Sequence, residues 1–176
     1  MEAVFFLLNA VVSFFTTLFL LRFLMQLARV SFAGQIGDFV VKLTNWAVKP
    51  LRRFIPGFAG IDWASLLAAL ALQALLAGLI VGISGAPLGD VPGAGSMILL
   101  LTVRGLLRLT VYILIIAVIL LAVLSWVSPY SPVASLAHQL TRPLLDPIRR
   151  IVPTISGIDL SPLVAILLLQ VVLIYL

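Results

Sequence analysis

Long apolar runs and shorter amphipathic stretches alternate along the chain. The apolar runs cover residues 3–21, 63–83, 97–127 and 160–176. A helix of about 20 apolar residues is long enough to cross the hydrocarbon core of a bilayer. The pattern therefore predicts an all-α membrane protein with four transmembrane helices, and the first of these can continue as helix to residue 28.

One amphipathic stretch separates the two apolar runs in each half of the chain. Residues 36–49 place apolar side chains at i, i+3, i+4 and i+7 and polar side chains on the opposite face, and residues 133–142 repeat this design. Each stretch is too short to span a bilayer, so we expect helices that lie in the membrane interface. Proline disfavours a helical conformation in the residue before it, so Pro50 should end the first helix, and Pro143 and Pro147 the second.

One motif occurs twice without a gap, 97 positions apart. Residues 50–62 read PLRRFIPGFAGID and residues 147–159 read PIRRIVPTISGID, which share the pattern P-x-R-R-x-x-P-x-x-x-G-I-D. Two prolines around an arginine pair predict a stiff, extended turn rather than a continuing helix. The repetition predicts two tandem repeats, residues 1–83 and 97–176, joined by a glycine- and proline-rich connector at residues 84–96.

Basic residues are distributed unevenly between the two predicted sides of the membrane. Nine of the eleven lysines and arginines lie in or beside the two motif loops, and only Arg104 and Arg108 lie on the other side. By the positive-inside rule, both motif loops are cytoplasmic and both termini are periplasmic. The two halves then have the same orientation, which makes them parallel repeats about an axis along the membrane normal.

Composition excludes the soluble class of protein. Hydrophobic residues make up 63% of the chain and charged residues 10%, whereas a soluble domain has roughly a quarter charged residues. The net charge of +5 lies beside apolar spans, which indicates contact with an anionic membrane face rather than with nucleic acid. The start of the chain carries Glu2 in place of a basic segment, so we expect a retained span rather than a signal peptide.

The sequence offers little catalytic chemistry. It has no cysteine and one histidine, His138, so we expect no thiolate metal site, no metal centre and no cofactor. None of its six acidic residues falls in the middle of a predicted span, where it would indicate a proton or ion path. We therefore predict a protein that is not an enzyme.

The strongest candidate for binding is the pair of arginine dyads in the motif. Guanidinium groups bind phosphate oxygens in a bidentate manner, so these dyads and the neighbouring basic residues are predicted to contact anionic lipid headgroups or a protein partner. The alternative is that they only set the topology. The predicted binding residues are Arg52, Arg53, Arg149, Arg150, Lys42, Lys49 and Arg142.

Two further pairs of polar residues recur at the repeat spacing. Asp62 and Asp159 each precede an apolar run, where a carboxylate can cap the first helical N–H groups; a catalytic carboxylate is the less favoured alternative. Gln73 and Gln170 fall near the predicted bilayer midplane, where each amide needs a partner, and symmetry predicts that they pair with each other. We expect Arg22, at the end of the first span, to extend towards the headgroups.

The doubled motif, each copy ahead of an apolar segment, resembles the YggT family of bacterial and plastid membrane proteins over nearly the whole chain. The resemblance implies a multi-pass protein of the bacterial inner membrane. It links the chain to osmotic-stress tolerance and to envelope or cell-division contexts, and through plastid relatives to haem attachment during cytochrome b6f assembly. A direct haem site has little support in a chain with no cysteine and one histidine.

These observations together predict a non-enzymatic adaptor or assembly factor. It would contact anionic lipid, and another membrane protein or a second copy of itself, through the two cytoplasmic arginine motifs. The alternative is a subunit of a small oligomeric channel or transporter, because four spans alone make a poor pore.

Overall fold

A computed structural model describes residues 2–55, 57, 60–83, 93–152 and 159–176. Its described residues form six α-helices and confirm the all-α class. In chain order, the helices are α1 (Glu2–Leu27), α2 (Gln35–Phe54), α3 (Trp63–Ile83), α4 (Ala94–Val127), α5 (Pro132–Arg149) and α6 (Ser161–Tyr175). Most of the predicted connector, residues 84–92, lies outside the described residues, and its last three residues already belong to α4.

Three of the helices are long and apolar enough to cross a membrane: α1, α3 and α4. The helix α4 has 34 residues and is about 51 Å long, well beyond a hydrocarbon core of about 30 Å. The fourth predicted span is shorter than expected, because α6 has only 15 residues and a length of about 22 Å. By length and composition, therefore, three spans are evident and α6 is a shorter apolar helix.

The amphipathic helices α2 and α5 do not end at their prolines. Pro50 lies inside α2, and Pro143 and Pro147 lie inside α5, so the prediction that these prolines end the helices was wrong. The arginines of the first motif are likewise in the last turn of α2, not in an extended turn. In the second motif, Arg149 is the last residue of α5 and Arg150 follows it with a helical backbone conformation, so no extended turn forms there either; residues 153–158 lie outside the described residues.

Packing explains why helix α5 continues past its first proline. An internal proline removes one backbone hydrogen bond and disturbs the preceding turn, but tertiary contacts outweigh such local preferences. Leu145 and Ile148 follow Pro143 and are buried in a cluster with Val118 of α4 and Ala165 of α6. The burial of these side chains holds the last turns of α5 in helical form.

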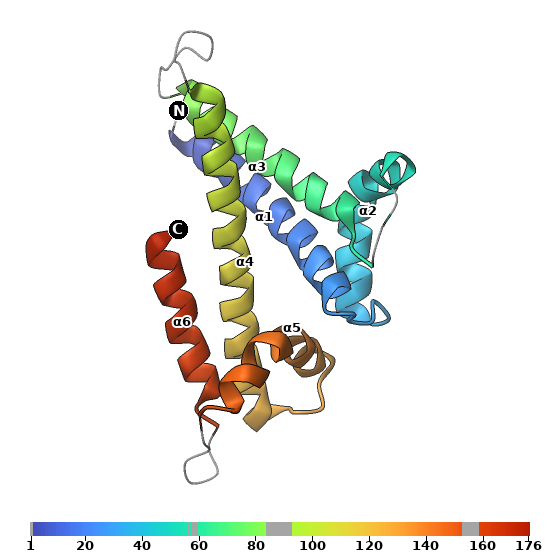
Figure 1. Ribbon diagram of the computed structural model, residues 1–176. Coiled ribbons are helices and arrows are strands. Elements are labelled where there is room, and N and C mark those ends of the chain that lie inside the picture. The colour runs from blue at the N-terminus through green and yellow to red at the C-terminus, as the bar shows by residue number, and fades with distance from the viewer. Residues whose placement is uncertain (1, 56, 58–59, 84–92, 153–158) are drawn as a thin grey trace.

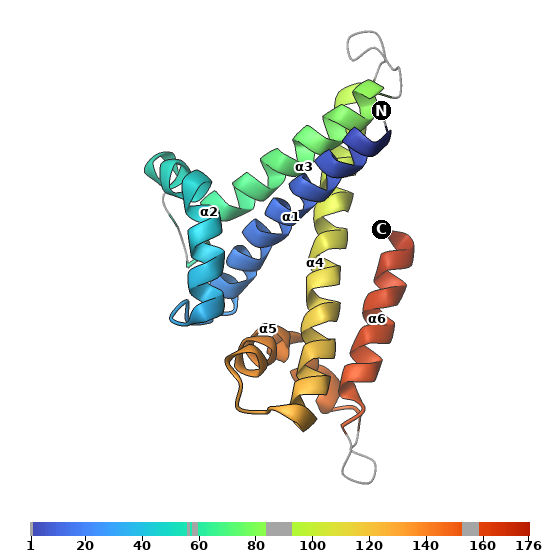
Figure 2. The ribbon, with the colours of Figure 1, turned by 180° about the vertical axis from the view of Figure 1, so that it is seen from behind.

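The helices form two groups of three around the long helix α4. Within α1–α3 and within α4–α6, each helix contacts the other two, and α4 joins the groups through contacts with α3 and α1. Figures 1 and 2 show that α4 lies between α3 and α6, and that α1 and α4 run in one direction while α3 and α6 run in the other. The helices α2 and α5 lie across the ends of the apolar helices.

Small residues on α3 allow the helices of the first group to approach closely. Ala64, Ala68 and Ala69 are buried against Phe19 of α1 and Leu106 of α4, in a cluster that also includes Val48 of α2. Small side chains at such interfaces let neighbouring backbones come together where no hydrophobic effect drives association. The close packing of α1, α2 and α3 brings the polar ends of all three to one junction.

Candidate functional site

Asp62 forms the centre of a polar junction between α1, α2 and α3. It directly precedes α3, after a turn in which Gly60 has a φ of 77°, a conformation that glycine adopts without steric cost. Its carboxylate accepts the backbone N–H of Ser65 at 3.4 Å and the hydroxyl of Ser65 at 2.7 Å. Asp62 is only 2% exposed, so the carboxylate is held at the start of the helix and away from solvent.

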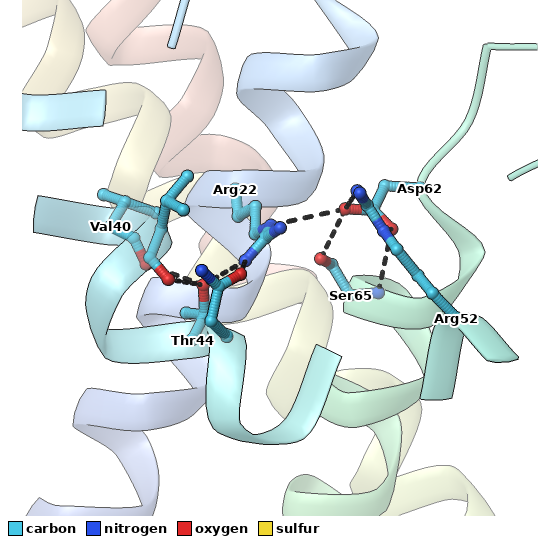
Figure 3. Close-up of polar contacts among 8 residues, drawn as sticks. Arg22, Val40, Thr44, Arg52, Asp62 and Ser65 are labelled. Carbon is cyan, nitrogen blue, oxygen red and sulfur yellow. Dashed lines mark hydrogen bonds and ion pairs between the residues drawn. The ribbon is translucent and has the colours of Figure 1, made fainter. Parts of the chain in front are cut away.

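Two arginines from different helices converge on this carboxylate (Figure 3). Arg52 of α2 donates from Nη2 to Oδ2 at 2.7 Å and from Nε to Oδ1 at 3.4 Å. Arg22 of α1 places its Nε 3.5 Å from Oδ2, an ion-pair contact rather than a hydrogen bond. The carboxylate therefore links the end of α1 and the end of α2 to the start of α3.

The guanidinium group of Arg22 also forms hydrogen bonds to α2. Its Nη1 donates to the hydroxyl of Thr44 at 2.6 Å and to Oδ1 of Asn45 at 3.1 Å. The Thr44 hydroxyl donates in turn to the carbonyl of Val40 at 2.6 Å, so the threonine is both donor and acceptor. Thr44 is fully buried and Arg22 is 5% exposed, so the guanidinium has no route to the headgroups and the prediction that it extends towards them was wrong.

The charges at this junction do not cancel. Burial raises the pKa of Asp62, but the hydrogen bonds from Arg52 and Ser65 outweigh it and hold the pKa below its ordinary value. Asp62 is therefore an anion at neutral pH, and it faces two guanidinium groups that stay protonated. The junction carries one excess positive charge, with Arg52 as its more exposed member.

The second motif repeats only part of this arrangement. Arg149 donates from Nε to Oδ2 of Asp159 at 2.9 Å, and Oδ1 accepts the backbone N–H of Ser161 at 2.9 Å. The position equivalent to Arg22 is Ile119, so a second arginine is missing. Asp159 has 34% of its side chain exposed, compared with 1% for Asp62. Burial raises the pKa of Asp159, but the hydrogen bonds from Ser161 and Arg149 outweigh this effect, so the pKa lies below its ordinary value.

The two arginines of each dyad have different environments. Arg52 and Arg149 are each paired with the aspartate of their own motif. Arg53 and Arg150 have no such ion pair among the described residues, and they are exposed, as are the other predicted binding residues. These others are Lys42 and Lys49 on α2, and Arg142 on α5, which pairs with Asp146 at 3.2 Å.

The two predicted midplane glutamines do not meet. Gln73 is buried on α3 with its side chain against Gly105 of α4, and Gln170 is exposed on α6. Helix α4 separates the two helices (Figure 1), so the predicted pair is replaced by a contact between α3 and α4. The sequence placed both residues at one depth, but depth does not specify which neighbour a helix face meets.

The sequence pattern did not identify Arg22 as a member of the junction. The position of Arg22 in the chain could have indicated this role. The first predicted span ends, and the second begins, on the same side of the membrane, so Arg22 and Asp62 are expected at a similar depth. The repeat hid this signal because Arg22 has no basic counterpart in the second half. Among the residues that the structure describes, no three His, Cys, Asp or Glu side chains gather as metal ligands would.

Comparison with known proteins assigns the family. The CCB3/YggT family model matches residues 1–83 and 100–176. The chain is similar to the uncharacterised protein YggT of Escherichia coli K12, with 39% identity over 98% of this chain and 88% of that protein. It is also similar to an uncharacterised protein of Pseudomonas aeruginosa, with 37% identity over 97% and 86% of the two chains. No solved structure matches. With these matches over nearly its whole length, the chain belongs to the CCB3/YggT family.

Proposed function

We propose that this protein is a non-enzymatic adaptor or assembly factor of the bacterial inner membrane. It binds anionic lipid, and through the same face a protein partner, with the exposed cations of α2 and α5. The resemblance of its doubled motif to the YggT family supports a role in envelope stress tolerance, in particular tolerance of osmotic stress. In this role the protein binds other molecules and does not catalyse a reaction.

The observation that carries the proposal is the difference between the two arginines of each dyad. All four arginines are exposed, but Arg52 and Arg149 are paired with aspartates, whereas Arg53 and Arg150 have no ion pair among the described residues. A planar guanidinium with free N–H groups can bind a phosphate in a bidentate manner. In each dyad, therefore, the first arginine fixes the end of the amphipathic helix and the second is available to a headgroup.

The composition of α2 supports placement at the lipid surface. Lys42, Lys49 and Arg53 are exposed on this helix, and so are the aromatic side chains of Trp46 and Phe54, at 63% and 84%. A helix that exposes both cations and aromatic rings is typical of the membrane interface. The rings enter the acyl boundary while the cations remain at headgroup level.

The proposal includes the membrane topology. Residues 1–83 and 97–176 form parallel tandem repeats joined by the connector at 84–96, and each repeat has two spans, including α6 as the fourth. The two motif loops are cytoplasmic and both termini are periplasmic. The equivalent contacts within α1–α3 and within α4–α6 support this division, and the common direction of α1 and α4 supports the parallel arrangement (Figure 2).

Lipid retention by the purified full chain tests the proposal. In mild detergent with equal amounts of phosphatidylglycerol and phosphatidylcholine, the double variant Arg53→Gln/Arg150→Gln should retain less phosphatidylglycerol than the native protein. The matched control is Arg104→Gln/Arg108→Gln, which removes the same charge from α4 on the proposed periplasmic side. Equal retention by the two double variants would show that the exposed arginines of the motifs are not lipid ligands.

A further inference from the structure

The second motif borders a cleft. The cleft has a volume of about 450 Å³ between α4, α5 and α6. Its polar wall consists of Ser125, His138, Arg149 and Asp159, and its apolar wall includes Ala122 and Trp126. The volume is in the range of sites for small ligands or for part of a lipid.

A comparison of the two repeats explains why the second ion pair is accessible from this cleft. The positions equivalent to Ile119 and Ala122 are Arg22 and Met25. In the first half, both of these larger side chains are buried, at 5% and 1% exposure. Arg22 adds a second guanidinium to Asp62 there, whereas Asp159 has only one and remains a third exposed. Smaller side chains and a missing arginine leave the second ion pair accessible.

We propose that this cleft binds the headgroup of a zwitterionic aminophospholipid, of which phosphatidylethanolamine is the representative. The ion pair of Arg149 and Asp159 carries no net charge, so a ligand that complements it has one anion and one cation close together. Phosphate contacts the N–H groups of Arg149 other than the Nε already bound to Asp159, and the primary ammonium contacts the Asp159 carboxylate. Trp126 is 83% exposed and covers the start of an acyl chain.

The cleft continues into a second hollow along α5. Leu121, Ser125 and His138 line both spaces, and Pro129 and Ala134 extend the second one. A small solute would fill only the polar end, whereas a lipid has a headgroup at the ion pair and a chain along the apolar wall. The inference rests on the proposed placement of α5 at the membrane interface, but it concerns a different lipid class and a different site from Arg53 and Arg150.

Competition between lipids with identical acyl chains tests this inference. Phosphatidylcholine has the same phosphate but a quaternary ammonium without N–H donors, so it cannot hydrogen-bond to Asp159. The native full chain should retain phosphatidylethanolamine over phosphatidylcholine by roughly two- to fivefold, the range for a partly exposed ion pair. Asp159→Asn should abolish this preference, and Ala122→Met should reduce retention of both lipids because it fills the cleft while preserving every charge.

The control is Asp146→Asn, which removes a partly exposed acid of α5 that does not line the cleft. No preference in the native chain, or an equal loss in Asp146→Asn and Asp159→Asn, would overturn the inference. Native mass spectrometry that counts bound lipids reads out the result, and thermal melting shows that each variant is folded. Phosphatidylglycerol retention in the same samples reports on Arg53 and Arg150 separately, so failure here is distinguishable from failure of the anionic-lipid proposal.

Discussion

The side chain of Gln73 on α3 occupies the space that a side chain at Gly105 on α4 would need. A Cβ built at Gly105 overlaps the amide nitrogen and Cδ of Gln73. The contact lies where the first group of helices meets α4, and it buries the glutamine to 9% exposure. A glycine and a long polar side chain therefore fit together at the boundary between the two halves of the chain.

This fit predicts a specific cost for adding one methyl group. Gly105→Ala should lower the free energy of unfolding by about 1–3 kcal/mol, because the buried amide must move or the helices must separate. Gln73→Ala should remove the clash, so the double variant should be more stable than the sum of the two single changes predicts. Thermal melting in detergent measures the cycle. Gly78→Ala is the matched control, since no atom lies within 4 Å of its added Cβ; an equal loss in Gly78→Ala would contradict the prediction.

The two motif aspartates should differ in their contribution to stability. Asp62→Asn leaves the buried Arg22 guanidinium without its counter-charge, which costs about 3–5 kcal/mol for a buried pair. Asp159→Asn breaks a partly exposed pair and should cost about 1 kcal/mol or less. Denaturation of the full chain in mixed micelles compares the two variants directly. Equal losses would mean that burial at the first junction does not govern its energetics.

Stability should decline in acid because of the same aspartates. Their folded-state pKa values are lowered, so their contribution is complete above an unfolded pKa of about 3.9. It is lost as pH falls below this value towards the folded pKa. The melting temperature should therefore be steady from neutral pH to about pH 5 and fall below about pH 4. In Asp62→Asn this acid-dependent fall should be smaller, and an unchanged slope would exclude Asp62 as its source.

The proposed topology can be read from single cysteines, because the native chain has none. Lys49→Cys and Arg142→Cys replace exposed residues of α2 and α5, and Ser96→Cys replaces an exposed residue at the start of α4. A membrane-impermeant maleimide should label position 96 in intact spheroplasts and positions 49 and 142 only after lysis. Labelling of positions 49 and 142 from opposite sides would contradict the parallel repeats.

Hydrophobic periodicity was sufficient to predict the helices, because a membrane requires long apolar helices with their polar groups at the ends. It also located α2 and α5, whose apolar and polar faces are well separated in the sequence. The ends of these two helices were wrong. Local proline preferences predicted a stop at Pro50 and Pro143. In α5, Leu145 and Ile148 are buried beyond Pro143 and keep the chain helical.

The candidate site was less predictable than the fold because its contacts depend on the rotation of helices about their axes. The motif identified Arg52 and Asp62 as candidate residues. It did not predict that their side chains form an ion pair or that Arg22 joins them, as the structure shows. The predicted pairing of Gln73 with Gln170 relied on equal depth, and depth alone does not determine which helix a side chain meets. The differences between the two copies were as informative about the site as the identities. The most important difference is Ile119 at the position equivalent to Arg22.

The buried Arg22 also has a consequence for the order of events during synthesis. Its counter-charge, Asp62, lies 40 residues later in the chain, so α1 leaves the ribosome with a cation near the end of its span and no acid to neutralise it. A charge in this position is tolerated only while it remains near water. We expect α1 to settle at its final depth only when α3 has arrived beside it, so α1 and α3 enter the bilayer as one cooperative step, with α2 at the interface, rather than one after another.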